Sequence, residues 1–519
     1  MKRKIILPIV LSTVLLLACT CPVFALPFLG STPTPQPLPQ SLPATATPEK
    51  ITTPPPPVSQ TEAPFNLAWD DRSPFEKNLA SSSRSILTGL PGASVYHIAF
   101  SISNPPTSVS GVEEVHYTNQ ENVTLTEVDF AIFSEILGGS ISVNNILLDD
   151  QPVAPVYSPG LMRVPLTVPL EPGQEVTFHV EFEVTVPTLG GDYYYGIFGY
   201  NDNILSLAHA YPTILVYNEQ GWNNQTPDLD GDPLFSDISF YLVSIDAPAD
   251  LTLVASGVEV DRSETAGRQQ VLYADGPARD FYLVASSDFV EQSEKVGEIT
   301  FNSYTSTRLK AYAQSALKTA EAAIDDFSRR YAPYPYTEFD IAPIVTSAGG
   351  VEFPGMTVLA EDAYSGGDFL EIVVTHEVGH QWFYNLVGNE TQSQPWLDES
   401  LAEFVTWQYY LDKHGTQGAQ SYQDEMQATW DSLDDQKIPI GEQVSAYSSD
   451  GYVAIVYGRG PFFFLALRQQ IGQATFDSLM HDYAQTFAWK IATTDSFKQL
   501  AEQHCACDLT PLFDAWVNP

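Results

Sequence analysis

The sequence is poor in basic residues. Its 519 residues include 23 Lys and Arg against 64 Asp and Glu, which gives a formal net charge of −41. We therefore expect no nucleic-acid partner, because phosphate binding needs a basic surface. Only 17% of the residues are charged and 44% are hydrophobic. This balance buries a core, so wholesale disorder is excluded, and the length is typical of about two to four domains.

Cysteine is scarce as well. The four cysteines lie in two pairs near the chain ends, Cys19 with Cys21 and Cys505 with Cys507, and cannot form a disulfide framework. A bond between Cys505 and Cys507 is one interpretation of the second pair, although its ring would be tight. A second metal site is less favoured, because only two thiols and His504 are present there.

The N-terminal apolar run is too short for a comfortable membrane span. It covers residues 5–18, behind the basic residues 2–4, whereas a bilayer needs about 20 apolar residues. The run ends in Leu-Leu-Ala-Cys19, which resembles the bacterial lipobox. The resemblance implies a signal peptide over residues 1–18, lipid attachment at Cys19, and an exported protein anchored to the outer face of a bacterial membrane. A plain signal peptide on a secreted protein and an uncleaved N-terminal anchor are the alternatives.

A tether is predicted over residues 19–64. Within it, residues 27–64 hold 12 prolines and only three charged residues, a composition typical of a semi-extended spacer. Such a spacer after a lipid-accepting cysteine would hold a globular body off the membrane.

The remaining chain predicts an α+β protein of two domains. Apolar and mostly polar residues alternate along residues 175–186, the clearest of several strands, so residues 65–295 are predicted to form a β domain. Residues 309–327 carry apolar side chains at helical spacing, and the chain is mostly helical from residue 369. We therefore predict a mixed domain that ends in helices over residues 296–519.

A metal-binding motif lies in this mixed domain. Residues 376–380 read His-Glu-Val-Gly-His. On a helix, residues four apart share a face, so His376 and His380 can reach one zinc ion, and Glu377 can approach an attacking water without being a ligand. No proline follows the motif until Pro395, which is compatible with a helix on both sides of it.

Glu399 supplies a third candidate ligand. Eighteen residues separate it from His380, enough for a loop and a returning helix that bring the carboxylate back to the histidines. Two histidines, one carboxylate and an open fourth position form the ligand set of a catalytic zinc, whereas structural sites are usually closed by four protein ligands. We predict one Zn²⁺ bound by His376, His380 and Glu399. An incidental amphipathic helix with two histidines is the alternative.

Around these residues, the sequence resembles a known family, the gluzincin aminopeptidases, which include aminopeptidase N and leukotriene hydrolase. The resemblance is carried by residues 376–387 (His-Glu-Val-Gly-His-Gln-Trp-Phe-Tyr-Asn-Leu-Val) and 396–404 (Trp-Leu-Asp-Glu-Ser-Leu-Ala-Glu-Phe). Landmarks such as Tyr334-Pro-Tyr336 extend it over most of residues 90–510. It implies a saddle-like β domain followed by a thermolysin-like catalytic domain.

The family's Gly-x-Met-Glu-Asn strand resembles the segment from Gly349 to Phe353, Gly-Gly-Val-Glu-Phe. The resemblance assigns Glu352 to the free α-amino group of the substrate, which suits a carboxylate that faces an ammonium. Backbone groups around Gly349 and Gly350 would let a peptide lie alongside as an added strand. Phe353 replaces the family's asparagine and its polar contacts, which leaves an endopeptidase open. A strand carboxylate exposed to water is the alternative for Glu352.

A tyrosine completes the predicted site. Residues 456–461 (Val-Tyr-Gly-Arg-Gly-Pro) resemble the family's Tyr-x-Lys-Gly segment, whose tyrosine donates a hydrogen bond to the oxyanion. Tyr457 takes that position, because a phenol is a good neutral donor for developing negative charge. Tyr452 and Tyr447 are nearby alternatives.

The predicted activity is that of a zinc-dependent peptidase, most directly an aminopeptidase acting on extracytoplasmic peptides. Glu377 would take a proton from the attacking water and pass it to the leaving amine. An endopeptidase or another hydrolase on the same scaffold is the rival within this class. A catalytically silent, tethered binding lipoprotein with a structural zinc is the rival from another class, which the retained Glu377 and Tyr457 disfavour. Oligomeric state and side-chain preference have no signal in the sequence.

Overall fold

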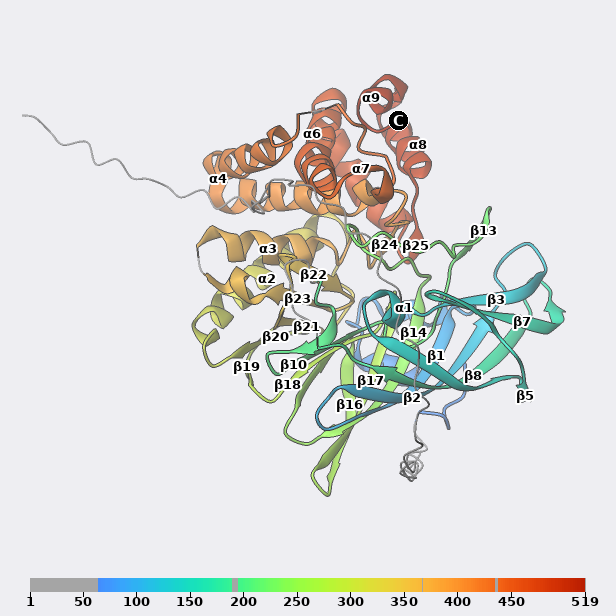
Figure 1. The fold of residues 1–519 in the computed structure, drawn as a ribbon. Helices are drawn as coiled ribbons and strands as arrows, with labels where there is room; N and C mark the ends of the chain where they lie inside the picture. Colours follow the sequence, from blue (N-terminus) through green and yellow to red (C-terminus); the bar gives the residue numbers. More distant parts are fainter. Residues whose placement is uncertain (1–63, 189–194, 366, 435–436, 519) are drawn as a thin grey trace, which may run out of the picture. The chain divides into compact units, whose positions relative to one another are not determined.

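The computed structural model describes residues 64–188, 195–365, 367–434 and 437–518. The predicted signal peptide, Cys19 and the predicted tether up to residue 63 lie outside the described residues. Within the described part, no helix is both long and apolar enough to cross a membrane. The described chain is β-rich first and helical last (Figure 1), so the predicted α+β class is confirmed.

The β domain, residues 94–286, is built on an eight-stranded sheet with the order β16-β17-β14-β1-β2-β8-β4-β5. All neighbours pair antiparallel except β1 and β14, which are parallel. Every second residue of β8 from Val176 to Val184 is buried, because one face of the sheet packs on the core. The strands are β1 (Ser94–Ile102), β2 (Ser108–Thr118), β4 (Ser140–Leu148), β5 (Gln151–Pro152), β8 (Glu175–Thr185), β14 (Ser239–Pro248), β16 (Val258–Thr265) and β17 (Arg268–Ala278).

Smaller sheets complete this domain. Two four-stranded sheets have the orders β15-β18-β10-β9 and β11-β3-β7-β6, and β12 pairs with β13. Their strands are β3 (Leu125–Ala131), β6 (Val156–Ser158), β7 (Leu161–Leu170), β9 (Phe198–Asn201), β10 (Ile204–Ala208), β11 (Thr213–Ile214), β12 (Tyr217–Asn218), β13 (Gly221–Trp222), β15 (Thr252–Ala255) and β18 (Tyr282–Ser286).

The C-terminal domain, residues 289–518, starts with a five-stranded sheet of order β19-β20-β21-β23-β22, so β22 is an edge strand. The predicted domain boundary between residues 295 and 296 falls at the end of β19, whose hairpin with β20 belongs to this sheet. The strands are β19 (Phe289–Val296), β20 (Ile299–Ser306), β21 (Glu338–Ile344), β22 (Gly350–Phe353) and β23 (Met356–Ala360), and β24 (Val387–Gly388) pairs with β25 (Lys490–Ile491) further on.

Helices cover this sheet and extend to the end of the domain. Figure 1 shows α3 between α4 and strands β22 and β23, and α3 contacts all three elements. Alanines fill much of the buried face of α2, which lets that helix pack closely against β20 and α3. The α-helices are α1 (Phe133–Ile136), α2 (Lys310–Arg330), α3 (Asp368–Gly379), α4 (Glu399–Asp431), α5 (Ser449–Tyr452), α6 (Gly460–Ile471), α7 (Gln473–Thr486), α8 (Thr494–Cys505) and α9 (Thr510–Trp516).

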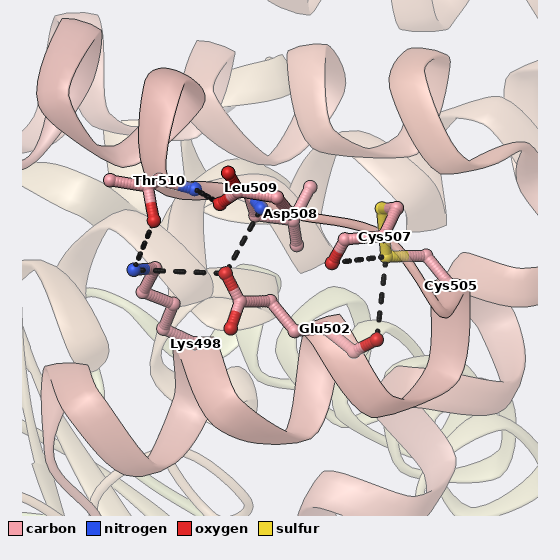
Figure 2. Close-up of a disulfide and its surroundings, with 7 residues drawn as sticks. All are labelled: Lys498, Glu502, Cys505, Cys507, Asp508, Leu509 and Thr510. Carbon is pink, nitrogen blue, oxygen red and sulfur yellow. Dashed lines mark hydrogen bonds and ion pairs between the residues drawn. A yellow bond between two sulfur atoms is a disulfide. The ribbon is translucent and has the colours of Figure 1, made fainter.

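Cys505 and Cys507 form a disulfide at the end of α8, so the pair is not free to bind a metal (Figure 2). Ala506 between them has the left-handed conformation that ends the helix. On the preceding turn, Glu502 accepts a hydrogen bond from the backbone of Leu509, and this contact ties α8 to the segment that leads into α9. The disulfide therefore closes a single local turn at the junction of two helices.

Candidate metal centre and active site

Helix α3 presents the two histidines of the motif. Leu370, Val374 and Val378 are buried at helical spacing, so the helix lies between the sheet and α4. His376 and His380 are one turn apart and point the same way, with their Nε2 atoms 3.1 Å from each other. The described helix ends at Gly379 rather than continuing through the apolar residues that follow.

Glu399 reaches both histidines from the first turn of α4. Its Oε2 atom lies 3.2 Å from Nε2 of His376 and 3.4 Å from Nε2 of His380. The preceding residue, Asp398, caps the helix by accepting a hydrogen bond of 2.6 Å from the Glu399 backbone, and Asn389 donates to Asp398 at 3.0 Å. The cap fixes the start of α4 and therefore the direction of the Glu399 side chain.

The outer nitrogen of each imidazole lies within 3.2 Å of a protein oxygen, and within the described chain only that of His380 makes a hydrogen bond. Nδ1 of His380 lies 3.0 Å from the carbonyl oxygen of Phe383, which can only accept, so this nitrogen carries the hydrogen. Nδ1 of His376 lies 3.2 Å from Oε1 of Glu403. Such contacts leave the Nε2 lone pairs free to face inward.

This donor set fits a zinc ion. Two Nε2 atoms and one carboxylate oxygen converge from α3 and α4, and all three lie within 4.8 Å of one another. Burial lowers the pKa of His380, but Glu352 and Glu399 outweigh burial and raise it to about 10, so the pocket strongly favours positive charge. Two histidines and one carboxylate are the ligand set of mononuclear catalytic zinc centres, and this arrangement belongs to that class.

Glu377 lies beside this centre and faces β22. Its side chain is buried, and its Oε2 atom has no hydrogen-bond partner among the described residues. Burial raises the pKa of Glu377 to about 8, against the opposing effect of His376. The carboxylate comes so close to Gly350 that a Cβ atom there would lie 2.5 Å from Oε1. Glu377 therefore has an unoccupied acceptor atom next to the candidate ligands.

Glu352 projects from β22 toward the same pocket. One donor atom each from Glu352, Glu377 and His380 lie within 4.8 Å of one another. Glu352 is 8% exposed, so it is not the water-exposed strand carboxylate of the alternative interpretation. Burial raises its pKa to about 7, although His380 lowers it.

Phe353, the residue that departs from the family pattern, faces away from this pocket. Successive residues of a strand point to opposite faces, so Phe353 points away from the side that Glu352 occupies. Its ring stacks on Tyr282 of β18, with centroids 3.8 Å apart and an interplanar angle of 5°. Phe353 therefore joins the two domains through a ring stack on the face of β22 opposite Glu352.

Tyr457 borders the centre from a π-helix, η6 (Val453–Arg459), a wide helical turn that is frequent at functional sites. Its ring stacks on His376, with centroids 6.0 Å apart and an angle of 21°. Tyr452 is buried against Tyr457, and the hydroxyl group of Tyr447 donates to the carbonyl of Pro439. Burial, and then Glu399, raise the pKa of Tyr457 well above its ordinary value, so its hydroxyl group keeps its hydrogen.

Three contributors to the centre were not predicted. Glu403 lies four residues after Glu399 on α4, a spacing that places both on one helix face and was available as a signal. The Phe383 carbonyl had no signal in the sequence. Gln381 donates a hydrogen bond of 2.9 Å to the Phe353 carbonyl and accepts one of 3.0 Å from the Gly355 backbone. It therefore ties the end of α3 to the β22–β23 turn.

Comparisons with known proteins agree with this class. Residues 315–516 match the family model described as the peptidase family M1 domain. The chain is 24% identical over 308 residues to Aminopeptidase M1-B of Oryza sativa subsp. japonica, which covers 54% of this chain and 34% of that protein. It is 26% identical over 186 residues to Leucine aminopeptidase 2 of Yarrowia lipolytica, which covers 32% of this chain and 28% of that protein. The chain thus spans about a third of the length of these curated relatives.

Solved structures share the fold. The M1 zinc metallopeptidase of Deinococcus radiodurans has a TM-score of 0.63 at 19% identity, covering 82% of this chain and 93% of that one. A mutant of that protein bound to a Tyr-Ser-Ala substrate has the same TM-score at 18% identity, covering 82% and 95%. Residues 315–516 are therefore similar to the peptidase family M1 domain, and the chain shares its fold with a solved zinc metallopeptidase.

Proposed function

We propose that this protein is a zinc-dependent aminopeptidase that removes N-terminal residues from peptides. The observation that carries the proposal is the convergence of three metal-ligand atoms with Glu377 and Glu352 in one buried pocket. A purely structural metal site would need neither of these two carboxylates.

The residues around the centre have complementary tasks in peptide hydrolysis. A bound zinc ion supplies Lewis-acid chemistry, which polarises the scissile carbonyl and lowers the pKa of water. Glu377 accepts the proton of the attacking water at its free Oε2 atom and delivers it to the leaving amine. Tyr457 donates its hydroxyl hydrogen to the developing oxyanion. Glu352 pairs with the ammonium group of the substrate's N-terminus.

The edge of the five-stranded sheet supports a binding mode for the peptide backbone. On one side β22 pairs with β23, and its other edge has no partner strand among the described residues. A substrate that runs along Gly349 and Gly350 would exchange main-chain hydrogen bonds with this edge. The ammonium would then meet Glu352 at the end of the bound segment, which limits cleavage to the first peptide bond.

A mixed peptide library, half of it N-acetylated, tests the activity. The full-length protein with one equivalent of zinc should release single N-terminal residues only from the free-amine half, as read by mass spectrometry. Internal cleavage of both halves would keep the metal chemistry but make the protein an endopeptidase and end the role given to Glu352. Zinc binding with no hydrolysis of any peptide would favour a silent binding protein.

Glu377→Gln is the matched catalytic variant, because it keeps the size of the side chain and removes the base. It should bind zinc at the wild-type stoichiometry and lose nearly all turnover. Wild-type cleavage by Glu377→Gln would contradict the mechanism while leaving the metal site intact.

We also propose that the protein is exported and anchored by lipid at Cys19, and that its substrates are extracytoplasmic peptides. The support is the lipobox-like sequence before Cys19 and the Pro-rich composition after it. Mass spectrometry of the mature N-terminus in a bacterial host should find an acylated Cys19. An unmodified terminus downstream, or an intact Met1, would contradict this assignment.

A further inference from the structure

Arg279 connects the β domain to the loop that follows the metal-binding helix. It lies between β17 and β18 and is 3% exposed. Its guanidinium group donates to Tyr384 and Asn385 in the loop at residues 381–388, and to Lys490 at the start of β25. One β-domain side chain therefore holds two separate segments of the C-terminal domain.

Within the described residues, every hydrogen bond of this guanidinium group goes to a backbone carbonyl. Nε donates to Tyr384 at 2.6 Å and to Asn385 at 3.1 Å, Nη1 donates to Ser236 at 2.9 Å, and Nη2 donates to Lys490 at 2.8 Å. Burial lowers the pKa of Arg279 to about 10, and Asp237 opposes this effect. A buried cation of this kind is stable only while its acceptors stay in place, so it fixes their positions.

The loop that Arg279 holds has an unusual backbone. After His380 the chain turns more widely than an α-helix, because Asn385 donates to the carbonyl of His380 and Val387 donates to that of Trp382. Tyr384 has a φ of 145°, a sparsely populated value for a residue with a side chain. Asp280, next to Arg279, accepts a hydrogen bond from the Tyr384 hydroxyl group at 3.3 Å. The β domain therefore binds this strained residue by both its backbone and its side chain.

The same loop carries the carbonyl group that orients a candidate zinc ligand. Phe383 accepts the Nδ1 hydrogen of His380 at 3.0 Å, and the next two carbonyls along the chain are those that Arg279 binds. The Phe383 carbonyl and the Tyr384 nitrogen share one planar peptide group, so a displacement of Tyr384 would be transmitted to that carbonyl. The His380 ring and the Arg279 side chain are therefore linked through three consecutive backbone carbonyls.

Gly388 leaves room for the guanidinium group. A Cβ atom at this position would lie 2.2 Å from Cζ of Arg279, so no other residue fits without displacing it. Gly388 belongs to β24, which pairs with the β25 strand that Arg279 also contacts.

We propose that Arg279 is a positioning residue for the metal centre: it holds the 381–388 loop so that the Phe383 carbonyl keeps the His380 ring in its metal-binding orientation. The inference rests on the proposed zinc site and extends it across the domain interface. Lysine cannot replace Arg279 here, since one ammonium group cannot span the fork of acceptors that a planar guanidinium reaches.

Zinc release is the measurement that tests this role. Loss of a group that orients a metal ligand typically weakens metal binding by about 10- to 100-fold. Zinc-loaded Arg279→Lys mixed with a chromophoric chelator should therefore lose the ion about 10- to 100-fold faster than wild type. The visible spectrum of the cobalt-substituted variant should shift as well, because it reports ligand geometry independently of activity. Gly388→Ala should reproduce both effects with Arg279 still present.

Two control variants separate positioning from loss of stability. Arg268→Lys changes another arginine of the β domain, one that binds Asp246 and the Ile102 carbonyl rather than the loop. Leu205→Ala removes a fully buried β-domain side chain and so lowers stability without touching Arg279. Both controls should keep the wild-type cobalt spectrum and release rate, even where their melting temperature matches that of Arg279→Lys.

The results decide between the possibilities. Wild-type release rates and spectra in Arg279→Lys, or equal changes in Leu205→Ala, would overturn the positioning role. If Arg279→Lys does not fold, Gly388→Ala carries the test by the same two readouts. Wild-type protein that binds no zinc would refute the proposed function itself, whereas normal wild-type binding with an unaffected Arg279→Lys would refute only this inference.

Discussion

Gly350→Ala is the sharpest test of the role given to Glu377, because it moves that carboxylate without changing it. The new Cβ atom would lie 2.5 Å from Oε1 of Glu377, whereas an ordinary van der Waals contact begins near 3.4 Å. The carboxylate must therefore retreat by about 0.9 Å. Gly350 has no positive φ, so alanine fits its backbone conformation. The perturbation is thus confined to the contact with Glu377.

A displacement of about 1 Å in a catalytic group can cost about 100-fold in rate, which corresponds to about 2.7 kcal/mol of transition-state stabilisation. We expect Gly350→Ala to lower kcat by about this factor and to keep one equivalent of zinc, because the ligands are untouched. Gly349→Ala is the matched control. Among the described residues its Cβ atom would meet only Val373, at 3.5 Å, so its kcat should stay near that of wild type even if its KM rises through contact with the substrate.

A double-mutant cycle then tests whether the effect passes through Glu377. Steady-state cleavage of a fluorogenic amino-acid amide gives kcat and KM for each variant. In a Glu377→Gln background the base is already lost, so adding Gly350→Ala should change the residual rate little. Equal losses in Gly349→Ala and Gly350→Ala, or fully additive effects with Glu377→Gln, would refute the reasoning. A rise in KM alone would instead show that the methyl group blocks the substrate strand.

Three further predictions follow from described residues. Tyr457→Phe should lower kcat by about 10²- to 10³-fold with zinc retained, as expected for loss of one oxyanion donor, while Tyr452→Phe should change kcat little. Glu113 is fully buried, both of its carboxylate oxygens lack hydrogen-bond partners in the described chain, and burial raises its pKa well above 4.5. A carboxyl group whose pKa is higher in the folded than in the unfolded protein lowers the stability of the fold as the pH rises above the pKa of the unfolded chain. Glu113→Gln should therefore raise the melting temperature more at pH 8 than at pH 5. A shift in melting temperature that does not depend on pH would refute this. Replacing Cys505 and Cys507 by serine should cost only about 1–2 kcal/mol in denaturant unfolding, because stabilisation by a disulfide grows with the loop it closes, and a loss above about 4 kcal/mol would contradict that argument.

The sequence predicted those features that depend on local patterns. Alternation of apolar residues predicted the strand at 175–186, and the structure has β8 over Glu175–Thr185. The spacing of the histidines predicted that they share a helix face, and their Nε2 atoms do converge. The prediction that Glu399 lies near the histidines assumed a returning helix, and α4 is that helix.

Features that depend on contacts between distant segments were not predictable in this way. The apolar residues after His380 are compatible with a longer helix, yet α3 ends at Gly379. Arg279, about 100 positions earlier in the chain, donates hydrogen bonds to the carbonyls of Tyr384 and Asn385, and the backbone there makes wider turns than an α-helix. The sequence pattern of residues 381–388 does not indicate that an arginine from a distant segment binds this loop.

The short edge strand β22 limits the length of peptide backbone that could pair with the sheet. The strand is only four residues long, so few main-chain hydrogen bonds are available to any partner that pairs with it. Main-chain pairing is nearly blind to side-chain identity, because every residue except proline offers the same donor and acceptor. A peptide held there would be measured by the position of its first amine rather than by its sequence, which suits stepwise trimming of many different chains. A short edge also offers little template for strand-to-strand aggregation.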